Sequence, residues 1–277
     1  MAPQNNLIAI DGSHLSVIDV GCGPAVVLGH GFMWDSQMWA PQIAALKGRY
    51  RVIVPELWGH GRSGPMPSST RSLADVARQH LAMLDHLEIE STVVVGLSAG
   101  GMWGAELAFL APERLSALVL LDTSLAPEPV ESQRGFLGML DLIEQTGAVP
   151  SPVLDALAGP LFFSSSVDKR HPGLRQRFRE SLMAWNVERL LDSVVPLGRM
   201  ICDRRDAMDE LAVLPMPAMV ATGVEDQARP PAEGRAMATR LRCDFVEIPE
   251  AGHMTSLEAP EMVNRLLADF LAKNAPT

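Results

Sequence analysis

TVVVGLSAGG, residues 92–101, is the segment that indicates the fold most strongly. It begins with a β-branched run, which favours a buried strand, and continues through glycines into a helix-like segment that reaches Ala111. Ser98 therefore lies on a sharp turn between a strand and a helix. Such a turn strains the serine backbone and needs small neighbours, which Gly96 and Gly100 provide. The segment predicts a nucleophilic serine at the start of a helix.

Short apolar runs alternate with helix-like segments on both sides of this turn. The predicted strands are residues 15–20, 25–28, 51–54, 91–95, 115–121, 218–222 and 243–248, and the predicted helices are residues 72–87, 98–111, 231–239 and 260–272. Ser72, followed by Asp75, has the pattern of a helix N-cap with an acid in the first turn. This alternation predicts an α/β fold with a mostly parallel central sheet of about eight strands and helices on both faces.

The alternation stops after Asp122. No convincing strand lies between Pro127 and Asp203, where helix-like stretches at 132–146, 174–184 and 187–202 are separated by prolines. We therefore expect a helical cap inserted after the sixth strand. The predicted division is a first part of the core at 1–126, the cap at 127–203 and a second part of the core at 204–277.

A second loop is placed to complete an oxyanion hole. Gly29-His30-Gly31-Phe32 follows the predicted strand 25–28. The tetrahedral intermediate of acyl transfer needs two converging N–H donors, one after the nucleophile and one from a separate loop. We predict the backbone N–H groups of Ala99 and Phe32 as these donors. His30 and His60 are interpreted as structural residues of their loops rather than as catalytic bases.

The serine needs a base, and the base needs an acid that fixes its tautomer. His253 lies after the predicted strand 243–248, at the sheet edge where open α/β folds bind ligands. Asp226 follows the preceding strand and is the predicted acid, with Asp122 at the end of strand 115–121 as the alternative. Glu225, the neighbour of Asp226, is expected to point away. The order Ser98, Asp226, His253 is that of α/β-hydrolases.

These motifs resemble those of the α/β-hydrolase superfamily in their order along the chain: His30-Gly31, Gly59-His60-Gly61-Arg62-Ser63, the segment 96–101, Gly223 to Asp226, and Gly252-His253. The chain is most similar to the group of small bacterial esterases, enol-lactonases and acyl-homoserine-lactonase-like enzymes. It departs from that pattern at Glu56, where relatives usually have Asp, and at Trp58, where they often have Arg. A serine nucleophile excludes the dehalogenase and epoxide hydrolase branches, which use Asp.

The resulting hypothesis is a serine hydrolase that cleaves carboxylic esters or lactones through an acyl-enzyme on Ser98 and needs no metal or organic cofactor. Small, uncharged and apolar substrates are expected, because the side chains predicted to line the pocket are apolar: Met33, Trp34, Leu97, Met102, Phe162, Trp185 and Met254. Phe32 is a further candidate near the predicted triad, and Phe163 and Met183 are further candidates from the cap.

Other functions use the same residues. The triad could serve a C–C bond hydrolase, with Arg189 or Arg199 of the cap gripping a carboxylate, or an acyltransferase or perhydrolase. A ligand receptor with a near-silent triad is the alternative from another class. Short-chain ester turnover that Ser98→Ala abolishes would separate an enzyme from a receptor.

The composition and net charge of the chain restrict the classes of molecule that it is expected to bind. The chain has 277 residues and a formal net charge of −10, which disfavours nucleic acid and an anionic membrane as partners. Three cysteines at wide spacing (Cys22, Cys202 and Cys243) fit neither a disulfide framework nor a zinc site. Together with an N-terminus that lacks a signal-peptide pattern, they predict a cytoplasmic protein. A monomer or small homo-oligomer is expected.

Overall fold

The computed structural model describes residues 5–275 and has one eight-stranded sheet in the order β1-β2-β4-β3-β5-β6-β7-β8. β1 pairs with β2, and β2 with β4, in antiparallel orientation, and the remaining neighbours are parallel. The predicted mostly parallel sheet is confirmed. The strands are β1 (Asn5–Ile10), β2 (Ser13–Val20), β3 (Ala25–Gly29), β4 (Arg51–Pro55), β5 (Thr92–Leu97), β6 (Leu115–Leu121), β7 (Ala218–Gly223) and β8 (Phe245–Ile248).

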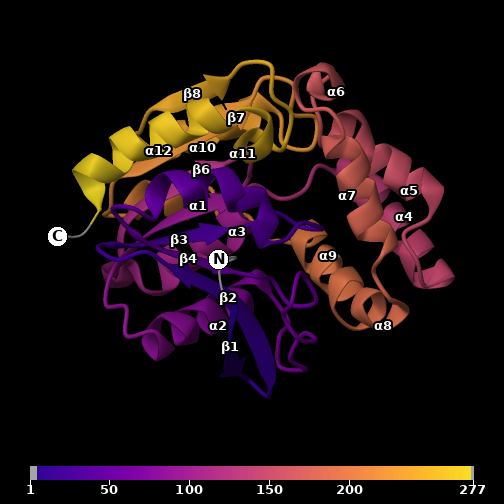
Figure 1. Ribbon diagram of the computed structural model, residues 1–277, viewed down its shortest axis with the longest axis horizontal. Coiled ribbons are helices and arrows are strands. Elements are labelled where there is room, and N and C mark those ends of the chain that lie inside the picture. The colour runs from indigo at the N-terminus through magenta and orange to yellow at the C-terminus, as the bar shows by residue number, and fades with distance from the viewer. Residues whose placement is uncertain (1–4, 276–277) are drawn as a thin grey trace.

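Helices cover both faces of the sheet (Figure 1). One face carries α1 (Ala40–Leu46) and α12 (Pro260–Asn274), which pack against each other. The other carries α2 (Leu73–His86), α3 (Ala99–Leu110) and α10 (Pro231–Leu241). The apolar core is accordingly divided into two clusters, one on each side of the sheet. Ser72 caps α2 as predicted, accepting a hydrogen bond from the Asp75 N–H.

The cap lies between β6 and β7, where the described chain is helical and forms no strand. Figure 1 shows its helices gathered at one side of the molecule, with α9 nearest the core. Its helices are α4 (Val130–Thr146), α5 (Ser151–Ala156), α6 (Val167–Arg170), α7 (Leu174–Met183), α8 (Val187–Arg189) and α9 (Val195–Cys202), with π-helical segments η3 (Leu157–Leu161) and η4 (Leu190–Val194). Most of the cap's buried apolar side chains belong to the same cluster as α1 and α12, whereas Leu197 and Ile201 of α9 belong to the cluster on the other side of the sheet.

Several short helices and one strand were not predicted from the sequence. They are β1, α1, α5, α6, α11 (Thr255–Glu258) and the 3-10 turns η1 (Ser36–Trp39), η2 (Pro112–Arg114) and η5 (Glu210–Val213). β1 is an edge strand with a clear alternation, in which Ile8 and Ile10 are buried and Leu7 is exposed. The predicted strand 243–248 begins only at Phe245, because Arg242 ends α10 in the left-handed conformation and the chain needs two more residues to reach the sheet.

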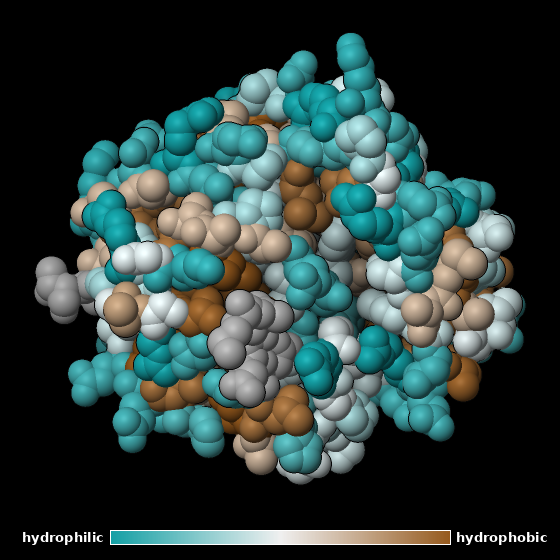
Figure 2. Space-filling model, in the orientation of Figure 1, coloured by the Kyte–Doolittle hydropathy of each residue, from teal (hydrophilic) through white to brown (hydrophobic). Residues whose placement is uncertain are grey.

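The visible surface carries both hydrophilic and hydrophobic residues (Figure 2). Hydrophilic residues predominate around the cap and along the upper rim of the face in Figure 2, and hydrophobic residues form separate patches among them. None of the helices within residues 5–275 combines the length and apolarity that a membrane span requires. The apolar stretch 92–110 is divided instead between the buried strand β5 and helix α3.

Candidate active site

Ser98 lies in the turn that joins β5 to α3, with φ 54° and ψ −119°. A non-glycine residue with positive φ is strained, and the surrounding structure must hold it there. The Ser98 N–H donates to the Leu121 carbonyl at the end of β6. A Cβ at Gly96 would lie 2.3 Å from the Gly100 carbonyl oxygen, and a Cβ at Gly100 would lie 2.1 Å from the Gly29 carbonyl oxygen. The two glycines are therefore required for this close approach.

The loop after β3 lies against the serine. A Cβ at Gly31 would lie 3.5 Å from the Ser98 Cβ. Within residues 5–275, the backbone N–H groups of Phe32 and Ala99 donate to no acceptor, while the Met33 N–H donates to His60 Nε2 at 3.1 Å. Two backbone donors without an acceptor thus lie in the two segments that meet at the strained serine, and the predicted oxyanion hole needs donors of this kind.

His253 and Asp226 form a buried hydrogen-bonded pair. His253 Nδ1 lies 2.8 Å from Asp226 Oδ2. The other carboxylate oxygen, Oδ1, accepts hydrogen bonds from the backbone N–H groups of Ala228 at 2.9 Å and Arg229 at 2.8 Å. A carboxylate can only accept, so His253 donates from Nδ1 and keeps the lone pair of Nε2 free to take a proton. This is the tautomer that a general base needs.

Asp122, the alternative acid, is engaged elsewhere. Its Oδ1 accepts from the Gly223 N–H at 2.8 Å, and its Oδ2 accepts from the Thr255 hydroxyl. It makes no hydrogen bond to His253. Burial and the neighbouring Asp226 carboxylate raise the pKa of Asp122 well above its ordinary value. Asp122 therefore connects the end of β6 to the end of β7 and to the segment that follows His253.

Ser98 and the hydrogen-bonded pair of Asp226 and His253 lie at one edge of the sheet. Ser98 follows β5, Asp226 follows β7 and His253 follows β8, and the carboxyl ends of these parallel strands face the same way. No hydrogen bond joins the Ser98 hydroxyl to the His253 ring within the described residues. In ligand-free enzymes such bonds are often long and tighten only when substrate binds.

His30 and His60 are structural, since both nitrogens of each ring are occupied. His30 pairs with the Gly31 carbonyl and accepts from the Leu57 N–H. His60 pairs with the Trp58 carbonyl and accepts from the Met33 N–H. Burial lowers the pKa of His30, and burial followed by the nearby His30 lowers the pKa of His60 to about 3. Because Nε2 of each ring accepts a backbone N–H, both rings are neutral, and together they hold the loop after β3 in place.

Most of the predicted pocket residues share one apolar cluster, which includes cap helices: Met33, Trp34, Leu97, Phe162, Phe163, Trp185 and Met254. Within it Trp34 stacks on Phe178 with ring centroids 4.6 Å apart, and the Phe162 ring stacks on the His253 imidazole at 5.1 Å.

Two pocket predictions need correction. Met102 is buried in the other apolar cluster and not in the one that holds the remaining pocket candidates. Met183 is 66% exposed at the end of α7, so it does not close the site.

Three further charged residues are bound elsewhere and make no hydrogen bond to Asp226 or His253. Glu225 accepts from the Ser165 N–H, as its predicted orientation requires. Arg199 is paired with Asp141 and Glu144 at 2.7 Å each, and Arg189 donates to the Gly61 carbonyl.

Hydrogen-bond donors surround Glu56, the residue at which the sequence departs from the pattern it resembles. Its carboxylate accepts from the Ser36 hydroxyl at 2.7 Å and from the Arg62 N–H at 2.6 Å. The longer side chain is thus accommodated by a dedicated set of donors.

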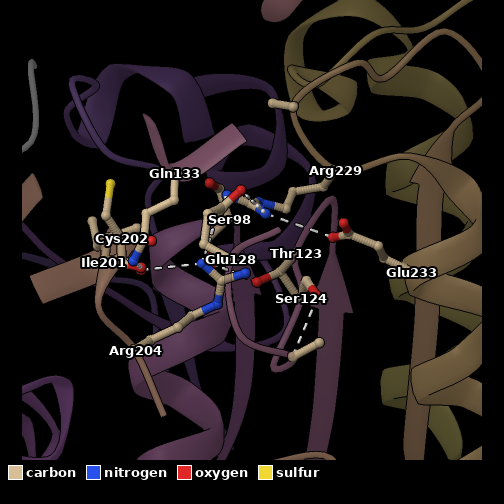
Figure 3. A network of polar contacts seen from close by, with 12 residues as sticks. Ser98, Thr123, Ser124, Glu128, Gln133, Ile201, Cys202, Arg204, Arg229 and Glu233 are labelled. Atoms are coloured by element: carbon tan, nitrogen blue, oxygen red, sulfur yellow. Dashed lines mark hydrogen bonds and ion pairs between the residues drawn. The ribbon is translucent and has the colours of Figure 1, made fainter. Parts of the chain in front are cut away.

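Sequence reasoning missed two groups of buried charges near the site. Glu258 accepts from the Gly252 N–H next to His253 and from the cap residue Ser164. Glu128, at the entrance to the cap, binds Arg204 and Arg229 (Figure 3). These partners are separated by 76 and 101 residues along the chain, so no local spacing could have indicated them. The described residues contain no cluster of three or more His, Cys, Asp or Glu suited to hold a metal ion.

The chain is similar to known hydrolases in sequence and in structure. A family model described as the alpha/beta hydrolase family matches residues 26–266. Among curated proteins, the chain is 25% identical to 3-oxoadipate enol-lactonase 1 of Acinetobacter baylyi over 248 residues, which cover 90% of this chain and 88% of that protein.

Solved structures resemble the chain over nearly its whole length, and two of them illustrate this. A thermophilic esterase from Thermogutta terrifontis, with malate bound, has a TM-score of 0.88 and 29% identity and covers 99% of this chain and 100% of its own. The enol-lactonase from Burkholderia xenovorans LB400 has a TM-score of 0.84 and 25% identity, with coverage of 96% and 100%.

Proposed function

The chain belongs to the α/β-hydrolase family and is a hydrolase, and we propose that it cleaves carboxylic esters or lactones through an acyl-enzyme on Ser98. The observation that carries the proposal is the 2.8 Å hydrogen bond from His253 to Asp226, at the same sheet edge as the strained Ser98. Support also comes from the relatives, whose names give them as an esterase and enol-lactonases.

In the proposed reaction, Ser98 Oγ attacks the carbonyl carbon while His253 Nε2 takes the hydroxyl proton. Asp226 holds the ring and stabilises the imidazolium that forms. The oxyanion accepts hydrogen bonds from the N–H groups of Phe32 and Ala99. His253 then protonates the leaving alkoxide, and a water molecule deprotonated by His253 releases the acid and regenerates Ser98.

The surroundings favour apolar acyl or alcohol groups. Trp34 comes from the loop after β3, and Phe162 and Trp185 come from the cap. All three belong to or pack against one apolar cluster. Arg199, one of the two cap arginines considered for a carboxylate, is already paired with two acids. Arg189, the other cap arginine, donates to the Gly61 carbonyl. An ester or lactone needs no cationic group, so it fits these residues better than a C–C substrate whose carboxylate would have to displace one of these contacts.

The test is a panel of p-nitrophenyl esters, γ- and δ-lactones and a vinylogous diketone. We expect turnover of short esters or lactones, loss of that turnover in Ser98→Ala, and unchanged turnover in the control Ser69→Ala, which alters an exposed serine. A fluorophosphonate probe should label Ser98, as mapped by mass spectrometry. Labelling of another residue, or ester turnover that survives Ser98→Ala, would contradict the proposal.

A further inference from the structure

A buried cluster of three charged side chains lies next to the loop of the proposed acid (Figure 3). Arg229 binds the Glu128 carboxylate with both terminal nitrogens, at 2.5 and 3.1 Å, and Arg204 Nη1 reaches the same carboxylate at 2.6 Å. In Figure 3 the two arginines approach from opposite sides. The side chains of Glu128, Arg204 and Arg229 are only 1%, 3% and 5% exposed.

The three members come from three different places in the chain. Glu128 precedes α4, where the chain enters the cap, and Arg204 follows α9, where the chain leaves it. Arg229 lies in the loop between β7 and α10, three residues after Asp226. The Glu128 carboxylate thus links the two places where the chain enters and leaves the cap to the loop that carries the proposed acid.

Arg229 is bonded to that acid through its backbone. Its N–H donates to Asp226 Oδ1 at 2.8 Å, while its guanidinium is fixed by Glu128 and lies 3.6 Å from Glu233. The backbone donor is therefore held in place by the side chain of the same residue. With Oδ1 fixed in this way, Oδ2 remains directed at His253.

A cluster of this kind is a costly way to stabilise a fold. Charges removed from water lose hydration, and apolar residues of the same volume are often as stable or more stable. Burial raises the pKa of the Glu128 carboxyl, but the two guanidinium groups more than offset it, so that its pKa lies below the ordinary value. The carboxylate therefore stays ionised and holds both arginines.

We propose that Arg229, anchored by Glu128, is a positioning residue that holds Asp226 in the orientation His253 requires. This inference rests on the proposed function, in which Asp226 orients the catalytic base. Arg204 binds the same carboxylate from the cap side, and within the described residues it makes no hydrogen bond or ion pair with the loop that carries Asp226. The two arginines are thus matched in partner and burial and differ in their connection to Asp226.

The matched pair provides the first experiment. Arg229→Met and Arg204→Met each leave Glu128 paired with one arginine, so both variants should fold, with a lowered melting temperature. We expect Arg229→Met to lower kcat about 10- to 100-fold with KM little changed, since small misplacements of catalytic groups have effects of this size. Arg204→Met should keep kcat within about twofold. Equal kcat losses in the two variants, or none in Arg229→Met, would overturn the proposal.

A double-variant cycle tests whether the effect acts through the acid. In an Asp226→Asn background, Arg229→Met should cause no further loss of kcat, because the group it positions is already gone. A full additional loss would show that Arg229 acts by another route. Arg229→Lys keeps the charge beside Glu128 and should restore part of the activity.

A spectroscopic readout separates this inference from the proposed function. The hydrogen-bonded Nδ1 proton of His253 should give a downfield proton NMR signal in the wild type that disappears in Asp226→Asn. We expect the signal to be lost or shifted in Arg229→Met and retained in Arg204→Met, whether or not esters are hydrolysed. An unchanged signal in Arg229→Met would refute the positioning role. Absence of ester turnover and of Ser98 labelling would instead refute the proposed function alone.

Discussion

Replacing Asp226 by Asn should disable the proposed base by reversing its tautomer. The Asp226 Oδ1 site receives two backbone N–H groups and Oδ2 receives the His253 ring. An asparagine would place its carbonyl oxygen where the two donors converge, and its NH₂ group would then face His253 Nδ1. Nδ1 would have to accept, the ring proton would move to Nε2, and Nε2 could no longer take the proton of Ser98.

The expected loss is about 10⁴-fold in kcat, equivalent to about 5 kcal/mol of activation free energy. The control is Asp122→Asn. Its carbonyl oxygen can keep the bond from the Gly223 N–H, and its NH₂ group can donate to the Thr255 hydroxyl, so we expect less than about a tenfold loss. Initial rates of p-nitrophenyl butyrate hydrolysis, with circular dichroism to verify folding, measure both. A larger loss in Asp122→Asn than in Asp226→Asn would refute this reasoning.

The remaining predictions concern stability and thiol reactivity. Gly100→Ala should lower the free energy of unfolding by about 3 kcal/mol, because the new Cβ would collide with the Gly29 carbonyl. Gly135→Ala should raise the free energy of unfolding by about 1 kcal/mol, because a Cβ there would have no atom within 4 Å and alanine favours the helix. Urea unfolding measures both changes. Because the pKa of Asp122 is raised in the folded protein, its proton stabilises the fold at low pH, and that stabilisation is lost as pH rises from the ordinary value of 3.8 through the raised one. Asp122→Asn should therefore gain stability relative to the wild type as pH increases across that window, and a flat difference in urea titrations would contradict this. With a thiol reagent at neutral pH, the exposed Cys22 should react first, and the other two cysteines, whose pKa values burial raises to about 11, should react fully only after unfolding.

Much of the fold could be predicted because the signals are local. The β-branched run of β5, the glycines around Ser98 and the Ser72 cap each lie within a few residues of the structure they specify. The helical insertion after β6 followed from the absence of strand patterns. The edge strand β1 and short elements such as α6 were missed, since short segments carry too little periodicity to stand out.

The candidate site was predictable in part. Ser98 and His253 were indicated by glycines and by their positions after strands, but two carboxylates, Asp226 and Asp122, end neighbouring strands and look alike in sequence. Met102 was predicted to line the pocket from its closeness to Ser98 in the chain, although it is buried in the other apolar cluster. Closeness in sequence does not settle which face of a helix a side chain occupies.

By itself, the amino-acid sequence determined the α/β architecture, the strained turn at Ser98 and the set of residues able to act as acid and base, because backbone conformation and hydrophobic periodicity are set by near neighbours. Only the tertiary structure decided that Asp226 meets His253 while Asp122 binds Thr255, and that Glu128 joins Arg204 to Arg229. Those pairs lie 27 to 133 residues apart, and their contacts exist only once packing of the sheet and cap has brought the strand ends together.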